Sequence, residues 1–307
     1  MRPSSSNQNH GIDPEELRPA STVILVREHE TGFQVYLLKR SGQSRFFPGS
    51  YVFPGGTVAS EDRNADLWLR HSDLDLPAVE RRLGGTLAAT EALAHAVAAI
   101  RETFEEGGAL LAARARETTL GVQAICETRK VKKLSKGWFR EWAVSGGWFL
   151  QLSRLAPWTH WITPKMFKPR FDTRFFVASV PEGQECSPDK RETVHGTWVT
   201  PEQGLAGNLK GEIPLSPPTL VTLHELLRYK TPSELKDESG RRGWGEPRLP
   251  RVIPVERGAV ILEPWDPMIH DKDLVFDSGT LKERILTVSE PFSRLWLHEG
   301  IWRPVGL

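Results

Sequence analysis

The sequence has little of what marks several large classes of protein. It contains 307 residues but only two cysteines, Cys126 and Cys186, in unrelated contexts, so we expect no disulfide and no cysteine metal site. The formal net charge is only +1, which argues against a long nucleic acid as partner. No stretch approaches the roughly 18 consecutive apolar residues of a membrane span, and the polar start lacks the apolar core of a signal peptide. These absences predict a cytoplasmic protein with neither a membrane nor a nucleic-acid partner.

The composition that remains is that of a folded globular protein. Hydrophobic residues make up 39% of the chain and charged residues 26%, as is usual for soluble domains. The length allows one large domain or two small ones. We expect the polar residues 1–18 to form a disordered lead-in.

Strands are expected where short runs are rich in β-branched and aromatic residues. Residues 20–27 and 33–39 meet this description and are separated by a turn, and residues 171–180 and 194–199 meet it later in the chain. Residues 45–58 are dense in proline, glycine and aromatic residues, which favours a loop, a short strand and a glycine turn.

The clearest helix is predicted over residues 90–106. Val97, Ile100 and Phe104 recur at spacings of three and four, which is typical of an amphipathic helix. The glycine pair that starts at Gly107 supplies the stop signal. This helix is therefore expected to pack one face on a core.

The secondary structure expected in the rest of the chain follows a less regular sequence pattern. Residues 114–160 are interpreted as mostly helical, and residues 218–229 as a further helix. A helix starting at 200–205 would be capped by Thr200. A linker is expected at about 231–251 because glycine, proline and charge are frequent there. Short strands are expected after it, including one within 283–288.

Three carboxylates share the polar face of the predicted helix 90–106. Glu102, Glu105 and Glu106 lie opposite the apolar stripe at about 100° per residue, so we expect them to point outward. Like charges at this spacing cost a few tenths of a kcal/mol in an isolated helix. A divalent cation such as Mg²⁺ would offset that cost, since it prefers oxygen ligands and commonly serves phosphate chemistry. The alternative is a solvated charged face.

A longer pattern favours the metal interpretation. Gly56, five residues, Asp62, an insertion, and then Arg-Glu-Thr-Phe-Glu-Glu-Gly-Gly-Ala at 101–109 resemble the Nudix box. Thr103 stands where an aliphatic residue is usual, and Phe104 is expected to take over its packing. The resemblance implies hydrolysis of a nucleoside diphosphate linked to another group.

The same resemblance implies an α/β fold, a Nudix-type α/β/α sandwich with a mixed β-sheet. We expect the Nudix domain at 19–207, with an insertion at about 63–89. Residues 208–307 would form a C-terminal extension of short strands and helix, packed on that domain. A homodimer is possible.

The Nudix resemblance also implies roles for the site residues. Glu105 and Glu106 would bind Mg²⁺ or Mn²⁺, and the carbonyl of Gly55 would be a further ligand. Glu102 would also bind the metal or orient the attacking water. Arg101 would hold the glutamates by charge-assisted hydrogen bonds.

A remote acidic residue is expected to complete the metal site. Glu192 is the first choice and Glu185 the second, and the sequence does not decide between them. Further residues are expected to contact a small nucleotide substrate: Arg45, Asp62, Arg170 and Arg174.

The insertion within the box resembles one branch of the superfamily. Tyr-Val-Phe-Pro-Gly-Gly at 51–56, the long insertion and Leu110-Leu111 are similar to the peroxisomal-type coenzyme A diphosphatases and their bacterial relatives. Coenzyme A or acyl-coenzyme A is therefore the expected substrate. Three alternatives keep the chemistry: ADP-ribose, NADH or a nucleotide sugar. A non-catalytic nucleotide-sensing module is the alternative from another class.

Overall fold

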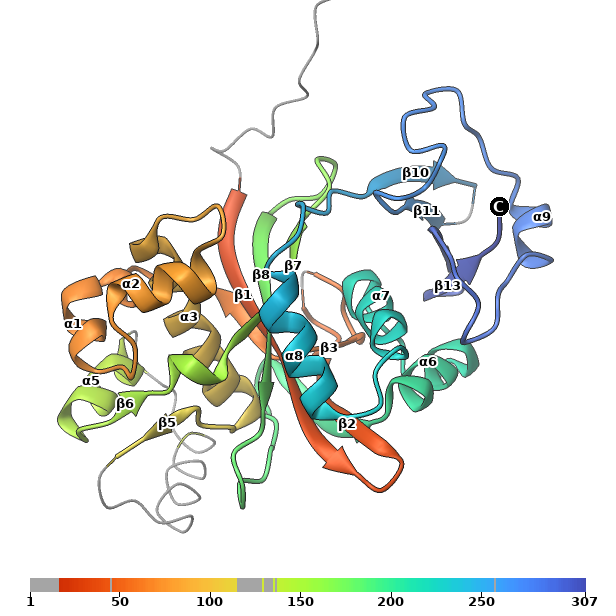
Figure 1. Ribbon diagram of the computed structural model, residues 1–307. Helices are drawn as coiled ribbons and strands as arrows, with labels where there is room; N and C mark the ends of the chain where they lie inside the picture. Colours follow the sequence, from red (N-terminus) through yellow and green to blue (C-terminus); the bar gives the residue numbers. More distant parts are fainter. Residues whose placement is uncertain (1–16, 45, 115–128, 130–134, 136, 257) are drawn as a thin grey trace, which may run out of the picture.

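A mixed β-sheet forms the centre of the molecule in the computed structural model, which describes residues 17–44, 46–114, 129, 135, 137–256 and 258–307 (Figure 1). Its seven strands follow the order β3-β2-β1-β8-β7, with β4 also paired to β1 and β9 to β2. Strands β1 and β8 are parallel, and the other pairs are antiparallel. The strands are β1 (Leu17–His29), β2 (Gly32–Arg40), β3 (Tyr51–Val52), β4 (Gly55–Thr57), β7 (Ala156–Ile162), β8 (Arg170–Ser179) and β9 (Thr193–Val199).

Both faces of this sheet are buried. On β1, Val23 and Leu25 belong to one hydrophobic cluster, whereas Ile24 and Val26 belong to another on the opposite face. This follows from the alternation of side chains along a strand. It also explains why β1 is a nearly continuous apolar run rather than an alternating one.

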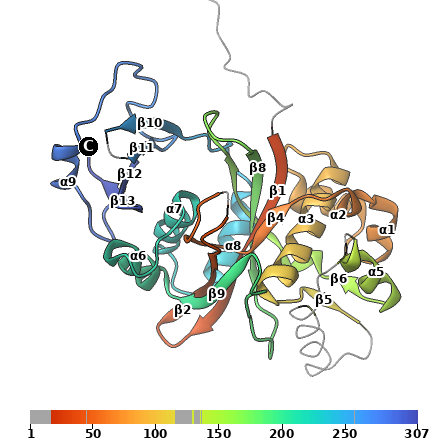
Figure 2. The same cartoon turned by 180° about the vertical axis from the view of Figure 1, so that it is seen from behind.

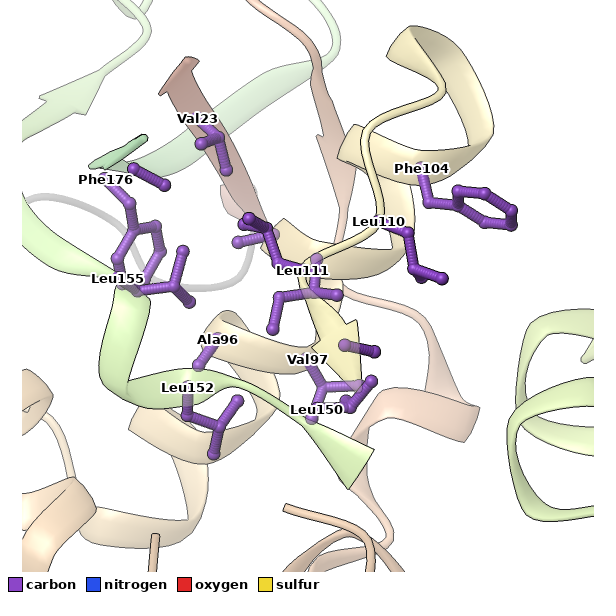
Figure 3. Close-up of a cluster of buried hydrophobic side chains, with 14 of the residues drawn as sticks. Val23, Ala96, Val97, Phe104, Leu110, Leu111, Leu150, Leu152, Leu155 and Phe176 are labelled. Carbon is purple, nitrogen blue, oxygen red and sulfur yellow. The ribbon is translucent and has the colours of Figure 1, made fainter. Parts of the chain in front are cut away.

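Helices of the box and its insertion cover the first face. Figure 3 shows Val97 of α3 packed among side chains such as Leu111 and Phe176. The insertion at 63–89 is itself mostly helical. The elements of this layer are η2 (Ser60–Arg63), α1 (Ala65–Arg70), α2 (Leu76–Val79), η3 (Glu80–Gly84), α3 (Ala89–Glu102), η4 (Thr103–Gly107), β5 (Ala112–Ala113), α5 (Trp138–Ser145), β6 (Phe149–Leu150) and η5 (Leu152–Arg154).

The second face is covered by helices α6 (Pro201–Lys210), α7 (Pro217–Leu226) and α8 (Pro232–Arg242). Thr200 caps α6 as expected, because its hydroxyl accepts a hydrogen bond from the backbone of Gln203 at 3.2 Å. The resulting α/β/α sandwich confirms the expected fold class.

The C-terminal part adds a separate antiparallel sheet. Its strands are β10 (Arg251–Val255), β11 (Gly258–Leu262), β12 (Arg294–His298) and β13 (Ile301–Val305), with the short helix α9 (Ser278–Lys282) beside them. The view from behind in Figure 2 places this sheet on the α6–α7 side, away from α3. Asn208 of α6 donates a 2.8 Å hydrogen bond to the carbonyl of Trp302, which fixes the two parts together.

Several expectations about the elements were wrong. The expected linker at 231–251 contains α8, where Thr231 caps the helix and Leu235 is buried. Residues 156–162 form strand β7 rather than helix, because they pair with β8. Residues 283–288 form no strand, and only Ile285 makes an isolated bridge.

The first strand begins inside the range 1–18 that was expected to be a disordered lead-in. Strand β1 already begins at Leu17, which pairs with Arg170; residues 1–16 lie outside the described part. Within that part, no single helix is long and apolar enough to cross a membrane. The pair Leu76–Gly84 and Ala89–Gly107 meets that criterion only when joined across a bend of 77°.

Candidate active site

A cavity of about 470 Å³ opens where η4, β4, β8 and the start of α7 meet. One part of its wall is acidic, with the carboxylates of Glu102, Glu105, Glu106 and Glu192. Another part is aromatic and proline-rich. The residues of this second wall include Phe46, Phe47, Phe53, Trp161, Pro164, Phe167, Phe171, Phe175, Pro217, Pro218 and Pro250.

The box helix widens at its end, and this changes how the glutamates point. After Glu102 the chain continues as the π-turn η4, which Gly108 ends with a positive φ of 77°. The wider turn buries both Phe104 and Glu106, the latter with 7% of its surface exposed. The expectation that all three glutamates point outward, which assumed 100° per residue, was therefore wrong for Glu106. Such turns inside α-helices are frequent at functional sites.

Arg101 links the first two glutamates. Its Nη1 donates to Glu102 at 2.7 Å and to Glu105 at 3.1 Å. Its Nε and Nη2 donate to the two oxygens of Asp62 at 3.0 and 2.8 Å. Arg101 therefore lies between the carboxylates, as we expected from the resemblance to the Nudix box.

The expected substrate contact by Asp62 is contradicted by this geometry. The side chain is 1% exposed and is not among the residues that line the cavity. It accepts hydrogen bonds from Arg101 and from the backbone of Ala59 instead. Asp62 thus balances the arginine charge and fixes its fork, because a bidentate pair sets orientation as well as energy.

Glu105 is held by residues far along the chain. The indole Nε1 of Trp138 donates a 2.7 Å hydrogen bond to its carboxylate. Arg129 donates to its backbone carbonyl and, at 2.6 Å, to the carbonyl of Ser187. The sequence near Arg129 is rich in lysine. The lysines that follow it lie outside the described residues: Lys130, Lys132, Lys133 and Lys136.

Gly55 and Gly56 allow the backbone to approach the carboxylates. The N–H of Gly55 donates to Glu106 Oε2 at 3.0 Å. A Cβ added at Gly56 would lie 2.5 Å from the carboxyl carbon of Glu102, and one at Gly55 would lie 2.4 Å from the carbonyl of Ser21. The Gly-Gly turn is thus required by close packing rather than by flexibility.

The crowded carboxyl groups are difficult to ionise. Burial, opposed by Arg101, raises the pKa of Glu102 to about 7. Burial and the nearby Glu102 raise the pKa of Glu106 well above its usual range. Burial also raises the pKa of Glu105, although Arg101 and the hydrogen bond from Trp138 oppose the shift. Burial alone would lower the pKa of Arg101, but Asp62 and Glu102 raise it, so this arginine stays charged.

These features fit a divalent cation. The donors that face the cavity are carboxylate oxygens, which hard cations prefer, and a cation would offset the negative charge whose burial raises the three pKa values. Among the residues that the structure describes, no three acidic, histidine or cysteine side chains are close enough together to hold a metal ion by themselves. Water and substrate oxygens would complete the coordination, as is usual for Mg²⁺.

The two candidates for the remote acid differ in position. Glu192 lines the cavity, and its negative charge is close enough to raise the pKa of Glu106. Glu185 is exposed and is not among the lining residues. The geometry therefore favours Glu192, which was also the first choice from the sequence.

The two arginines of β8 that were expected to contact the substrate do not line the cavity. The cavity is lined by Phe171, Thr173 and Phe175, so Arg170 and Arg174 belong to the opposite face of the strand. Arg170 donates to the carbonyl of Thr163 at 3.1 Å, and Arg174 lies over the ring of Trp244 at 5.4 Å. Both are buried, which contradicts a direct substrate contact. Arg45 lies outside the described residues.

Sequence reasoning missed three parts of the cavity wall. Arg40 at the end of β2 faces the carboxylates and lowers the pKa of Glu106. The stretch 216–219 at the start of α7 and Ile261 of β11 also line the cavity. No local pattern marks these residues, because segments far apart in the chain bring them together.

Comparisons with known proteins agree with this arrangement. A family model described as the NUDT19 Nudix domain matches residues 17–228. Acyl-coenzyme A diphosphatase NUDT19 of Xenopus laevis is 27% identical over 344 residues, covering 96% of this chain and 88% of that protein. The Homo sapiens protein of the same name is 28% identical over 304 residues, covering 86% and 80%.

A solved structure shares the fold. The crystal structure of a NUDIX hydrolase from Alicyclobacillus acidocaldarius superposes with a TM-score of 0.56 at 23% identity, covering 72% of this chain and 96% of that one. Nudix hydrolases generally use divalent metal ions. The box helix, its arginine-linked glutamates and the match over 17–228 together show that the chain belongs to the NUDT19-type family of Nudix hydrolases.

Proposed function

We propose that this chain hydrolyses the diphosphate bond of coenzyme A or of an acyl-coenzyme A, with Mg²⁺ or Mn²⁺ bound at the acidic wall of the cavity. Water would be added across the bond between the two phosphoryl groups. The products would be a 3′-phosphorylated adenosine nucleotide and a phosphopantetheine fragment.

The observation that carries this proposal is the composition of this cavity. Its acidic wall supplies the carboxylates that a metal–phosphate complex needs, and its other wall supplies apolar surface. A substrate that fits both parts has a diphosphate joined to a less polar group. The relatives named acyl-coenzyme A diphosphatase support the choice of coenzyme A.

The metal ligands in this proposal are Glu105 and Glu106, with Glu102, Glu192 and the Gly55 carbonyl as further oxygen donors. A bound divalent cation would polarise the phosphoryl oxygens and neutralise charge that develops on them. All of these residues line the same cavity, which supports their joint use.

The side chains of the box would position the reacting groups. Glu102 lines the cavity and its carboxylate is held by Arg101 at 2.7 Å, so it is placed to accept a proton from an attacking water. Arg101 holds Glu102 and Glu105 through one nitrogen, which limits their rotamers. Preorganised charges of this kind are a large source of rate enhancement.

A comparison of substrates tests this function. Steady-state rates with Mg²⁺ would be measured for coenzyme A, an acyl-coenzyme A, dephospho-coenzyme A, ADP-ribose and NADH, with products identified by mass. We expect the highest kcat/KM for coenzyme A or its acyl derivative. A clearly higher value for the dephospho form, ADP-ribose or NADH would refute the coenzyme A assignment and leave the diphosphatase activity in place.

A further inference from the structure

Arg40 is placed in the cavity by an irregularity in the sheet. Strands β2 and β9 pair regularly up to Lys39 and His195, and then Arg40 pairs with Thr193, so Val194 is skipped. Such a bulge bends the strand and redirects the side chains beside it. Glu192 follows directly, and its carbonyl accepts a 2.9 Å hydrogen bond from the backbone of Ser41. One bulge thus places both Arg40 and Glu192 at the edge of the cavity.

The charges around the cavity give Arg40 a special position. The described lining residues include the carboxylates of Glu102, Glu105, Glu106 and Glu192, and Arg40 is the one cationic side chain among them. Its positive charge is close enough to lower the pKa of Glu106. Among the described lining residues, an anionic substrate would therefore meet four negative groups and the one positive group of Arg40.

The guanidinium of Arg40 also has unused hydrogen-bonding capacity. Its Nε is buried and has no hydrogen-bond partner among the described residues, and Arg40 forms no ion pair with any of them. A buried donor without a partner costs roughly 1–3 kcal/mol. By contrast, Arg101, which also lies beside the glutamates, already donates to Asp62, Glu102 and Glu105.

We propose that Arg40 binds the diphosphate of the substrate, with its guanidinium donating to phosphoryl oxygens opposite the metal-binding carboxylates. The inference rests on the proposed function and deepens it. A planar guanidinium matches phosphate oxygens with two parallel donors, which a lysine does not reproduce. The diphosphate, rather than a more distant phosphate, is the partner because Arg40 lines the same cavity as the proposed metal ligands, and a cation bound by those ligands would hold the diphosphate beside them.

The test uses Arg40→Gln and Arg40→Lys, with Lys39→Gln as the matched control. Lys39 is the next residue on β2 and carries the same charge, but it lies over the ring of Tyr51 at 5.7 Å and does not line the cavity. The probe is α,β-methylene-ADP with Mg²⁺, whose P–C–P bridge is not hydrolysed, measured by calorimetry. Thermal melts would check that each variant is folded.

We expect Arg40→Gln to weaken binding of the analogue by about 10- to 100-fold, the effect of one charge-assisted hydrogen-bonding pair. Arg40→Lys should recover part of the loss, and Lys39→Gln should change binding less than twofold. The KM for coenzyme A and for its dephospho form should rise by the same factor in Arg40→Gln, because both contain the diphosphate.

Two outcomes would overturn the inference. One is unchanged binding of the analogue in a folded Arg40→Gln. The other is a KM increase confined to coenzyme A, which would assign Arg40 to the 3′-phosphate. If the wild-type protein cleaves no coenzyme A but still binds the analogue through Arg40, the inference stands and the proposed substrate is wrong.

Discussion

The indole Nε1 of Trp138 donates a 2.7 Å hydrogen bond to Oε1 of Glu105, while Arg101 donates to Oε2 of the same carboxylate at 3.1 Å. Both oxygens of this glutamate are therefore held, one from its own helix and one from α5. Trp138 also packs against Phe104, with ring centroids 6.0 Å apart. The segment that follows the box thus takes part in orienting the box.

Replacing Trp138 by Phe should weaken metal binding in acid. A smaller aromatic ring remains in place of the indole, but the N–H donor that lowers the pKa of Glu105 is lost. The Glu105 carboxyl is therefore protonated at higher pH. Protons then compete better with the cation. We expect the Mg²⁺ concentration for half-maximal rate to rise several-fold at pH 6 and the difference to shrink at pH 8.5. Trp142→Phe, in the same aromatic cluster, is the control. An equal effect at both pH values would point to packing alone.

Replacing Glu105 or Glu106 by Gln should reduce the rate by at least 10²-fold, on the order of 3 kcal/mol in the barrier. The substitution keeps the shape and removes the charge that would bind the cation. Glu91→Gln is the control, because Glu91 lies on the same helix in an exposed pair with Arg63. A near-normal rate in a folded Glu105→Gln and Glu106→Gln would show that these carboxylates are only a charged surface.

Glu192→Gln should lower the rate more than Glu185→Gln. Only Glu192 lines the cavity and lies near enough to influence Glu106. We expect a loss of roughly tenfold or more for Glu192→Gln, about 1.4 kcal/mol, and less than twofold for Glu185→Gln, measured as kcat at saturating Mg²⁺. The reverse order would transfer the role to Glu185.

Without metal, the carboxyl cluster should make the protein less stable as pH rises. Folding raises the pKa of Glu102 to about 7 and raises that of Glu106 well above its usual range, so the folded state holds protons that the unfolded chain releases. The stability this gives is complete at low pH and is lost as pH rises through about 7. We expect the Tm in chelator to fall between pH 5.5 and 8.5, and Mg²⁺ to reduce that fall.

The double variant Glu102→Gln and Glu106→Gln is the reference for this measurement. It is needed because Glu263 is fully buried with a pKa of about 8 and contributes a shift of the same sign. The difference between wild type and reference isolates the cluster. If that difference does not vary with pH, the carboxyl groups are not coupled to folding in this way.

The sequence was sufficient where one segment carried its own pattern. Strands β1, β2, β8 and β9 were predicted because each is rich in β-branched and aromatic residues. Helix α3 was predicted because a three-to-four spacing is visible within it. The placement of Glu102 and Glu105 on one face followed from helical spacing, and the resemblance to the Nudix box implied that Arg101 holds them. Local patterns thus predicted the centre of the fold and the core of the site.

Features that depend on distant segments were not predictable in this way. Alternation showed that Arg170 and Arg174 share a face of β8 but not that the cavity lies on the other face. The burial of Asp62 depends on Arg101, which lies 39 residues later. Arg40 faces the cavity because of a bulge opposite Val194, and the sequence has no marker for it.

The C-terminal part shows the same limit on a larger scale. Its polar residues 231–251 looked like a linker, yet Thr231 and Pro232 begin a helix whose Leu235 is buried. Strand β12 was missed because its sequence, Arg-Leu-Trp-Leu-His at 294–298, shows no clear alternation. Ile261 shows that this part completes the cavity wall.

The most direct measurement is the fate of coenzyme A in a metal-controlled reaction. Purified protein would be incubated with coenzyme A in Mg²⁺, in Mg²⁺ with excess chelator, and in Mg²⁺ with Glu106→Gln in place of wild type, and the products weighed by mass spectrometry. The account predicts a 3′-phosphorylated adenosine nucleotide and phosphopantetheine in the first reaction and intact coenzyme A in the other two. Intact coenzyme A in the first reaction, or the same two products in excess chelator, would contradict it.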